Sequence, residues 1–576
     1  MRPAHGPGTA AGVASQPAPD GALRWAPILL SALILAAKIP LLWQINVNWD
    51  EFYFLNLVYA RARGALTQVF QTAYTEIFLW LTSIHGYEVA QVVVARGVML
   101  ALLAVTALLI WRLAARWASP VAAGAAPLAY LASSPVLRHG DSFRADSMLA
   151  PLTLAILLLF TNRTAGPRAN VAAGACFGVA LALTVKAALL VPVLLACALL
   201  EQVTPEVAWR SRLGATLRRL LMFGLVAAVV AGVILLLHRL SLGAVPLESP
   251  GQFAARASGT TLLHVPLFPR RDYFQAIVYA DLVTWILIAI GLIAAFSQRR
   301  YALAAFGLSL LPIAFYRNTF PYYYVAMLGP ACVLAAAGVD AILALVRRTA
   351  DQAAARRMLL AAVIALSLQA ALHLFQLRED RQSQQRATIA AVHRIFPHPV
   401  PYIDHSGMVS SFPKTNFFMT SWGLEEYRAR GVGFMGEVMS RFKPPLLLAN
   451  REMLEPESSL FRSWLFPEDQ DLIRKFFLPY WGPIYIAGAE ANLTSAEAAN
   501  VQLPYAGRYR LNTSAPVVVD GQLRHNGDVI EVGESPHATV EAAPGDTPPV
   551  DVRFYWAAAE APPREAPPDM SLYFGL

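Results

Sequence analysis

Residues 219–240 read RLLMFGLVAAVVAGVILLLHRL, and this stretch decides what kind of protein the chain is. Between Arg219 and His238 there are 18 consecutive residues without a charge. About 20 apolar residues cross a hydrocarbon core of ~30 Å as a helix. A helix also makes all of its backbone hydrogen bonds within the segment, as the lipid interior requires. The stretch therefore predicts a transmembrane helix.

Comparable apolar runs recur along the first two thirds of the chain, from about Trp25 to about Phe375. The sequence of 576 residues is 56% hydrophobic and only 15% charged. Its mean hydropathy of +0.46 is far from that of an ordinary soluble protein, so most of the chain must be solvated by lipid. The eleven predicted crossings are residues 24–45, 88–111, 120–137, 145–161, 169–185, 187–201, 219–240, 275–296, 301–316, 322–345 and 358–376.

The stretch 169–201 is divided into two crossings because of its length. As one helix it would be about 50 Å long at ~1.5 Å per residue, well beyond the membrane core. Two short crossings, broken near Lys186, fit better. The predicted fold class is therefore an α-helical polytopic membrane protein with about eleven transmembrane helices.

Basic residues predict how the chain is oriented. The formal net charge of +8 comes mainly from arginines in short loops, which favours a positive-inside bias over nucleic-acid binding. With a cytoplasmic N-terminus, every inside loop is basic, and an odd number of crossings places the C-terminal part outside. We therefore expect a multi-pass protein of the bacterial inner membrane with an extracytoplasmic C-terminal domain. The arginines of the inside loops are Arg112, Arg116, Arg163, Arg168, Arg210, Arg212, Arg218, Arg219, Arg299, Arg300, Arg347, Arg348, Arg356 and Arg357.

The chain divides into three predicted regions. Residues 1–23 are rich in Pro, Ala and Gly and indicate a disordered cytoplasmic tail, residues 24–376 form the transmembrane domain, and residues 377–576 form the C-terminal domain. The last region begins with a charged helical stretch, continues as mixed α/β, and ends in alternating apolar and polar residues that predict β-hairpins. Asp520-Gly521 and Asn526-Gly527 are turn signals there. A small β-sandwich fits this pattern.

The three cysteines of the chain lie inside apolar runs and lack CxxC spacing, so neither a zinc site nor a disulfide framework is indicated. They are Cys176, Cys197 and Cys332.

Two adjacent acids open the first outside loop, which reads Asn48-Trp49-Asp50-Glu51-Phe52-Tyr53. Acidic residues favour the first turn of a helix, and this is the structural explanation for the pair. The functional explanation is a general base, or an acid that binds a metal, in a cleft above the membrane.

Further charges follow in the second outside loop, Leu137-Arg138-His139-Gly140-Asp141-Ser142-Phe143-Arg144-Ala145-Asp146. Snorkelling would explain the arginines but not the acids beside them. Lys186 lies alone between apolar residues, where a charged amine costs ~2.5–3.5 kcal/mol at mid-membrane unless it reaches water or an anion. Snorkelling to the surface and a functional role both stay open for Lys186.

The remaining outside loops add cations and phenols. The third, residues 242–274, holds Arg256, His264, Arg270, Arg271 and Asp272, and an ordinary solvated loop explains it as well. The fourth reads Tyr316-Arg317-Asn318-Thr319-Phe320-Pro321-Tyr322-Tyr323-Tyr324, and an interfacial aromatic belt accounts for its tyrosines. Together the loops indicate one cavity of cations, acids and phenols, where a lipid-linked phosphate head group would bind.

This order of motifs resembles that of the GT-C glycosyltransferases. The likeness covers roughly residues 24–345 and rests on the acidic pair, the Arg-x-Asp of the second loop, the lysine in a broken apolar segment and the Tyr-Tyr motif before a late crossing. It is greatest toward the branch of protein O-mannosyltransferases and the lipid A aminoarabinose transferase. Departures are Tyr74-Thr75-Glu76, where relatives often have a His-Pro-Pro-like segment, and Phe320-Pro321, where many have a His before the tyrosines.

The resemblance implies a cell-envelope enzyme that takes a sugar from a polyprenyl-phosphate carrier at the outer face and passes it, with inversion, to a glycan, lipid or protein acceptor. It implies that Asp50 is the base, supported by Glu51, and that Asp141, Asp146 and His139 orient the cations or bind the acceptor. The groups implied to bind the donor phosphate are Arg144, Lys186, Arg317, Tyr322 and Tyr324.

Two other functions compete with this interpretation. A transporter or flippase of lipid-linked glycans would use the same cavity without chemistry, although transporters usually have related halves and a site near the midplane. A non-catalytic assembly protein would bind glycans through its exported domain. The outside acids would permit a divalent metal, but their spacing does not require one, so metal binding stays open and no other cofactor is expected.

Overall fold

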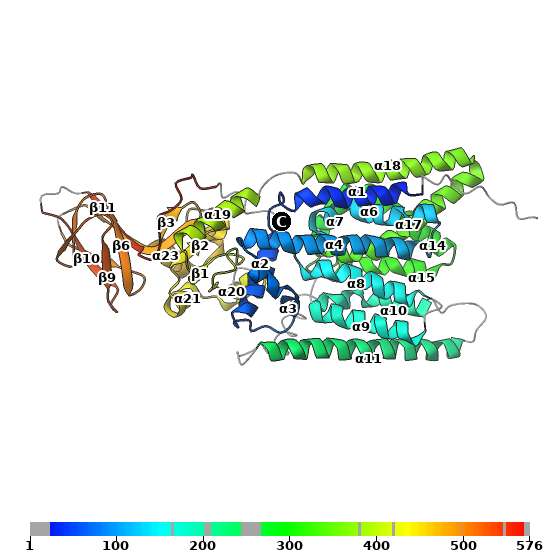
Figure 1. Cartoon of the computed structure of the whole chain (residues 1–576), viewed down its shortest axis with the longest axis horizontal. Coiled ribbons are helices and arrows are strands. Elements are labelled where there is room, and N and C mark those ends of the chain that lie inside the picture. The colour runs from blue at the N-terminus through cyan, green and yellow to red at the C-terminus, as the bar shows by residue number, and fades with distance from the viewer. Residues whose placement is uncertain are drawn as a thin grey trace, which may run out of the picture.

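The computed structural model contains a helical bundle and a C-terminal domain that extends from one end of it (Figure 1). It describes residues 24–162, 166–200, 209–242, 266–377, 382–416, 421–495, 497–544 and 549–568. The predicted tail, residues 1–23, and the loop residues Arg256 and His264 lie outside this part of the chain. We use "the bundle" for the helices up to residue 377, without the connection of residues 42–87, and "the C-terminal domain" for residues 382–568.

The bundle consists of long and short apolar helices. Four are long and apolar enough to cross a membrane: α4 (Glu88–Ala114), the Gly214–Ser241 part of α11 (Trp209–Ser241), Pro321–Thr349, which joins η4 (Pro321–Tyr323) to α17 (Tyr324–Thr349), and α18 (Gln352–Gln376). A bent pair, α13 (Arg271–Ala280) and α14 (Leu282–Ser297), meets at 95° and can form a fifth span.

Six shorter apolar helical segments complete the bundle in the described part of the chain. Each of the eleven predicted crossings coincides with one of these segments, the bent pair or a long helix, while the number that cross a membrane stays a prediction. The short segments are α1 (Ala26–Leu41), Pro120–Ala132 with α5 (Pro120–Ala123) and α6 (Ala125–Ala132), α8 (Ala145–Phe160), α9 (Pro167–Leu183), Val185–Leu200 with η2 (Val185–Leu190) and α10 (Val191–Leu200), and Tyr301–Phe315 with α15 (Tyr301–Ala304), η3 (Ala305–Leu310) and α16 (Pro312–Phe315).

The predicted break near Lys186 is confirmed. Helix α9 ends at Leu183, and Thr184 has an extended backbone with φ −156° and ψ 130°. Its side chain accepts a hydrogen bond from the backbone N–H of Lys186 at 3.4 Å, so it caps η2. A side-chain cap of this kind replaces a backbone hydrogen bond that the helix break removes.

Helix α17 lies at the centre of the bundle, and small residues let α14 approach it closely. A Cβ atom added at Gly338 would lie 2.2 Å from the carbonyl oxygen of Leu287, and one added at Gly291 would lie 1.8 Å from that of Leu334. In lipid, where hydrophobic attraction between helices is absent, such backbone contact supplies the packing energy.

The connection between α1 and α4 forms a small cap on the bundle. It contains α2 (Trp49–Ala62), α3 (Tyr74–Phe78) and η1 (Leu79–Ser83), and it lies between the bundle and the C-terminal domain (Figure 1). The loop with α7 (Ser134–His139) between α6 and α8 lies at the same end. The first and second predicted outside loops therefore share one end of the bundle.

The C-terminal domain is mixed α/β, as the sequence predicts. Its helices are α19 (Gln382–Ile395), α20 (Ser421–Arg430), α21 (Met435–Phe442), η5 (Glu452–Leu454), α22 (Ser459–Trp464) and α23 (Pro467–Phe476). Its strands are β1 (Tyr402–Ile403), β2 (Leu446–Leu448), β3 (Phe477–Trp481), β4 (Ile484–Leu493), β5 (Ala499–Gln502), β6 (Gly507–Thr513), β7 (Val517–Val519), β8 (Gln522–Arg524), β9 (Val529–Val532), β10 (His537–Ala542) and β11 (Val550–Trp556).

These strands form two sheets. A seven-stranded sheet has the order β1-β2-β4-β11-β6-β9, with β3 beside β4, and a four-stranded sheet has the order β5-β10-β7-β8. Only β1 and β2 pair in parallel among the named strands. Inward-facing side chains of both sheets, among them Leu511, Val540 and Phe554, share one apolar core. This is the small β-sandwich that the alternating pattern predicts.

One of the two predicted hairpin turns is confirmed and the other is corrected. Asp520 and Gly521 have φ values of 48° and 77° and join the antiparallel strands β7 and β8, which is the backbone that a two-residue hairpin requires. Asn526-Gly527 instead connects β8 to β9 of the other sheet. There the Gly527 N–H donates to the Leu511 carbonyl at 2.9 Å, so the segment is held by β6 rather than by β8.

Substitution of Gly338 tests the close crossing of α14 and α17. We expect Gly338→Val to destabilise the bundle by about 1–3 kcal/mol, because the added methyl groups must displace the α14 backbone. Gly232→Val is the matched control, since a Cβ at Gly232 meets nothing within 4 Å. The measurement is the midpoint of thermal unfolding in detergent, and equal midpoints for the two variants would contradict the packing described.

Candidate active site

The site begins at the first turn of α2, where the two acids of the first loop point to different partners. The Asn48 side chain accepts a hydrogen bond from the Asp50 N–H at 2.8 Å, and the Glu51 carboxylate accepts one from the Asn48 N–H at 3.0 Å. Together with the N3 backbone contact this is a capping box. The Asp50 carboxylate is 28% exposed and forms an ion pair with Arg144. Both acids lie in the first turn of α2, as the structural explanation predicts, and Asp50 in addition pairs with Arg144.

Glu51 is fully buried and joins α2 to the rest of the site. Its carboxylate pairs with Arg96 of α4 and accepts the Phe143 backbone N–H at 2.8 Å. Burial by itself would raise the pKa of Glu51, but the Arg96 charge and these hydrogen bonds outweigh it and lower the pKa. Glu51 is thus an ionised anchor that fixes the Asp50 helix against the loop that carries Arg144.

Four of the predicted site residues, Asp50, Arg144, Asp146 and Lys186, form one chain of charges. After the Asp50–Arg144 pair, the other Arg144 Nη lies 3.3 Å from Asp146, and the Lys186 Nζ lies 3.1 Å from Asp146. The Arg144 Nε is buried and has no hydrogen-bond partner among the described residues. The structure therefore brings α2, the second loop and η2 together at one end of the bundle, with a spare donor on the central arginine.

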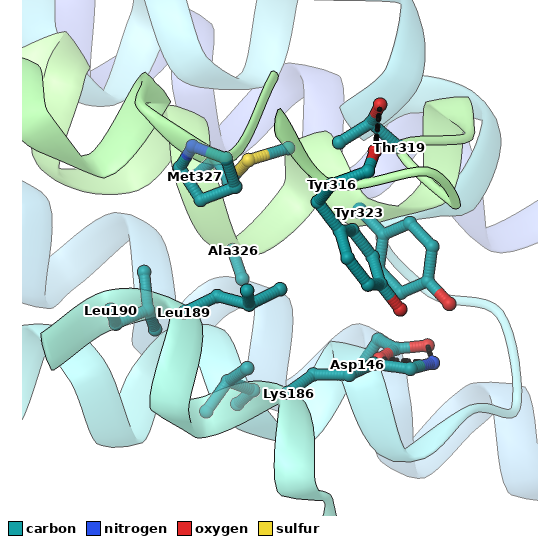
Figure 2. Close-up of a pocket in the computed structure, with 11 residues that line it drawn as sticks. Asp146, Lys186, Leu189, Leu190, Tyr316, Thr319, Tyr323, Ala326 and Met327 are labelled. Atoms are coloured by element: carbon teal, nitrogen blue, oxygen red, sulfur yellow. Dashed lines mark hydrogen bonds and ion pairs between the residues drawn. The ribbon is translucent and has the colours of Figure 1, made fainter. Parts of the chain in front are cut away.

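Tyrosines of the fourth loop cover these cations. The Tyr322 ring centroid lies 3.5 Å from the Arg144 guanidinium carbon, and the Tyr323 centroid lies 4.3 Å from the Lys186 Nζ. Both are cation–π contacts. Tyr316 packs edge-on against Tyr323 at 5.5 Å, and Figure 2 shows the hydroxyls of both rings near Asp146.

The sequence-based choice of Tyr324 does not match this geometry. The Tyr324 ring belongs to the apolar core of the bundle, and its hydroxyl is buried without a hydrogen-bond partner in the described part of the chain. Tyr323 and Tyr316 occupy the positions facing Lys186 and Asp146 instead. The reason is local: η4 ends at Tyr323, and Tyr324 is already the first residue of the buried helix α17.

A cavity opens beside the charged chain (Figure 2). Its volume is ≈ 20 Å³, about enough for one water. Its accessible wall is apolar, and the residues around it are Asp146, Lys186, Tyr316, Thr319, Tyr323, Leu149, Leu189, Leu190, Pro312, Ala326 and Met327.

The remaining predicted site residues, Asp141, His139 and Arg317, make contacts outside the chain of charges. Asp141 pairs with Lys38 of α1 at 2.9 Å, and both side chains are buried. The His139 ring contacts Tyr322 edge-on at 6.0 Å. The Arg317 carbonyl accepts a hydrogen bond from Arg270 Nε at 3.2 Å, which ties the third outside loop to the fourth.

Sequence reasoning missed the cations that hold the acids. Lys38 and Arg96 are single charges inside apolar runs, and such residues nearly always have a partner. That signal was present in the sequence, but it did not indicate which acid each one pairs with. Within the described ranges, no group of three or more His, Cys, Asp or Glu side chains is arranged to hold a metal ion.

Comparison with known proteins identifies the fold. No protein-family model and no curated protein matches the sequence. Among solved structures, ArnT from Cupriavidus metallidurans bound to undecaprenyl phosphate is similar, with a TM-score of 0.53 and 16% identity over 75% of this chain and 95% of that one. The oligosaccharyltransferase of Archaeoglobus fulgidus has a TM-score of 0.53 and 13% identity, over 88% of this chain and 76% of that one. The chain has the fold of the GT-C glycosyltransferases.

Substitution of Glu51 tests its role as an anchor. We expect Glu51→Gln to destabilise the protein by about 3–5 kcal/mol, because it leaves the buried Arg96 without a counter-charge. Glu490→Gln is the matched control: this carboxylate is 60% exposed in its pair with Arg553, and we expect a loss below about 1 kcal/mol. Thermal unfolding in detergent distinguishes the two, and a Glu51→Gln protein as stable as wild type would show that the pair is dispensable.

Proposed function

We propose that the protein is an inverting glycosyltransferase that uses a polyprenyl-phosphate sugar at the outer face of the membrane. The observation that carries the proposal is the chain Asp50–Arg144–Asp146–Lys186, which gathers two acids and two cations beside a small cavity. The GT-C fold supports it, and so does the ArnT structure, which contains undecaprenyl phosphate.

The reaction needs a base and a stabilised leaving group, and the site offers both. The acceptor hydroxyl would give its proton to Asp50 while its oxygen bonds to the anomeric carbon from the face opposite the phosphate. The bond between that carbon and the phosphate oxygen breaks, and the polyprenyl phosphate leaves with the electron pair. Arg144 and Lys186, both held near the cavity, would stabilise the charge that develops on the phosphate.

Charge balance suggests how donor binding prepares the base. Two acids and two cations neutralise each other in the chain of Asp50, Arg144, Asp146 and Lys186. Phosphate oxygens would compete with Asp50 for Arg144, whose unpartnered Nε offers a further donor. Binding of the donor would therefore free the Asp50 carboxylate to accept a proton.

The tyrosines have a role in this scheme as well. Tyr322 and Tyr323 lie over the two cations, and a ring face helps to keep a cation in one orientation. We assign donor-phosphate contacts to Arg144 and Lys186, with Tyr316 and Tyr323 as hydrogen-bond donors in place of Tyr324. Arg317, in the fourth loop, and His139 remain candidates for contacts with the donor or acceptor.

The assignment of Asp50 as the base is tested with purified protein, membrane extract as the acceptor source, and a panel of polyprenyl-phosphate sugars. We expect wild type to release polyprenyl phosphate from at least one donor, and Asp50→Asn to reduce release by about 10²–10⁴-fold. Asp551→Asn, on an exposed strand position of the C-terminal domain, should retain wild-type activity. A transporter would bind the lipid without releasing polyprenyl phosphate, and full activity of Asp50→Asn would exclude this residue as the base.

The assignment of Lys186 to the phosphate gives a separate prediction. We expect Lys186→Met to lower kcat by about 10²–10³-fold with the donor that wild type uses, because a cation that stabilises the leaving group is lost. Arg347→Met, in the last turn of α17, removes a charge far from the cavity and serves as the control. An unchanged kcat for Lys186→Met would assign Lys186 to folding alone.

A further inference from the structure

A loop of the C-terminal domain, residues 404–411, packs along α2, the helix that carries Asp50. The Ser410 hydroxyl donates to the Phe52 carbonyl at 3.4 Å, and Arg63 donates to the Ser410 carbonyl at 2.9 Å. Gly407 lies so close to Asn56 that a Cβ there would be 2.8 Å from the Asn56 Cβ, and its φ of +79° also favours glycine. The loop therefore contacts α2 from its first turn to its end.

The most specific contact is made to Trp49, the residue before Asp50. The guanidinium carbon of Arg451 lies 4.3 Å from the Trp49 ring centroid, and the His405 ring centroid lies 5.2 Å from it. Arg451 Nη1 also lies 2.8 Å from His405 Nε2. Burial, followed by the charges of Arg451 and Lys414, lowers the pKa of His405 well below its usual value, so His405 is neutral and accepts the Arg451 N–H.

This group is fixed rigidly within the C-terminal domain. The buried Asp404 carboxylate accepts the backbone N–H groups of Gly407 and Met408 at 2.8 and 2.7 Å. The Asn450 side chain accepts the His405 N–H at 2.9 Å and donates to Asp404 at 3.1 Å. The side chains that contact Trp49 are thus anchored to a network that is separate from the bundle.

We propose that Arg451 and His405 are positioning residues for the reaction, and that they hold Asp50 in place by fixing the ring of Trp49. This inference rests on the proposed function, because it assigns Asp50 the role of base. A base works only within hydrogen-bond reach of its proton, and a displacement of about 1 Å can cost ~10²-fold in rate. The C-terminal domain would therefore be part of the active site rather than an appendage to it.

A double-mutant cycle tests whether Arg451 acts through Trp49. We expect Arg451→Ala and Trp49→Ala each to lower kcat for polyprenyl phosphate release by about tenfold, a smaller loss than the full ~10²-fold of a 1 Å displacement. The KM for the donor should stay within about twofold of the wild-type value, because neither substitution removes a contact that binds the ground state and the transition state equally. The double variant should be no slower than either single variant, because coupled contacts are not additive. A hundredfold loss in the double variant would show independent roles and overturn the proposal.

Matched variants separate positioning from general damage to the domain. Arg428→Ala is the control, because Arg428 lies over Trp464 at 4.1 Å within the same domain, and we expect unchanged turnover. Arg451→Lys keeps a cation over the Trp49 ring and should recover at least half of the lost activity. Failure of this rescue, or an equal loss in Arg428→Ala, would contradict the assignment.

Hydrogen exchange of the protein in nanodiscs gives a measurement that does not depend on the reaction. In Arg451→Ala we expect the amides of residues 49–56 to exchange about tenfold faster, while α4 stays protected, since the contact holds α2 locally. Unchanged exchange would overturn the proposal even if turnover fell. If wild type releases no polyprenyl phosphate from any donor, the proposed function fails, while faster exchange would still establish the contact between Arg451 and α2.

Discussion

The ion pair of Glu51 with Arg96 is the interaction on which the site depends. Neither side chain is more than 5% exposed, and a charge moved out of water requires an opposite charge and good hydrogen bonds to be tolerated. Glu51 meets this requirement with Arg96, the Phe143 N–H and the Asn48 N–H. One carboxylate therefore fixes the start of α2, the first third of α4 and the second loop relative to one another. The Asp50–Arg144 pair forms because these three elements meet.

The same constraint explains why the polar side chains lie in pairs at one end of the bundle. Lys38 with Asp141 repeats the arrangement on α1, and Lys186 with Asp146 repeats it on η2. The first pair joins α1 to the loop between α7 and α8, and the second joins η2 to α8. The paired charges hold the helix ends together, and Asp50 and Lys186, whose side chains are 28% and 18% exposed, are their most accessible members.

The fold was more predictable from sequence than the site. The length of the apolar runs predicts the helices, because the lipid interior permits few other structures. The alternation of apolar and polar residues on either side of Asp520-Gly521 predicts a hairpin of the β-sandwich. The sequence also indicated that Asp50, Arg144 and Lys186 belong together. It did not distinguish Tyr323 from Tyr324, because that choice depends on where η4 ends and α17 begins. Helix boundaries are set by caps and packing to within a residue or two. A difference of one residue in such a boundary decides whether a side chain faces the cavity or the apolar core.

Contacts between segments that are far apart in the chain could not be predicted from the sequence. Nothing near Trp49 in the chain indicates that Arg451, about four hundred positions later, lies over its ring. The two meet because Gln385 of α19 bonds both the N–H and the carbonyl of Val47, and because the cap and the C-terminal domain share one apolar core. Burial of that shared surface favours a fixed orientation of the domain over a free one. Asp50, the proposed base, is consequently held from two sides, by buried charge in the bundle and by aromatic contact from the C-terminal domain.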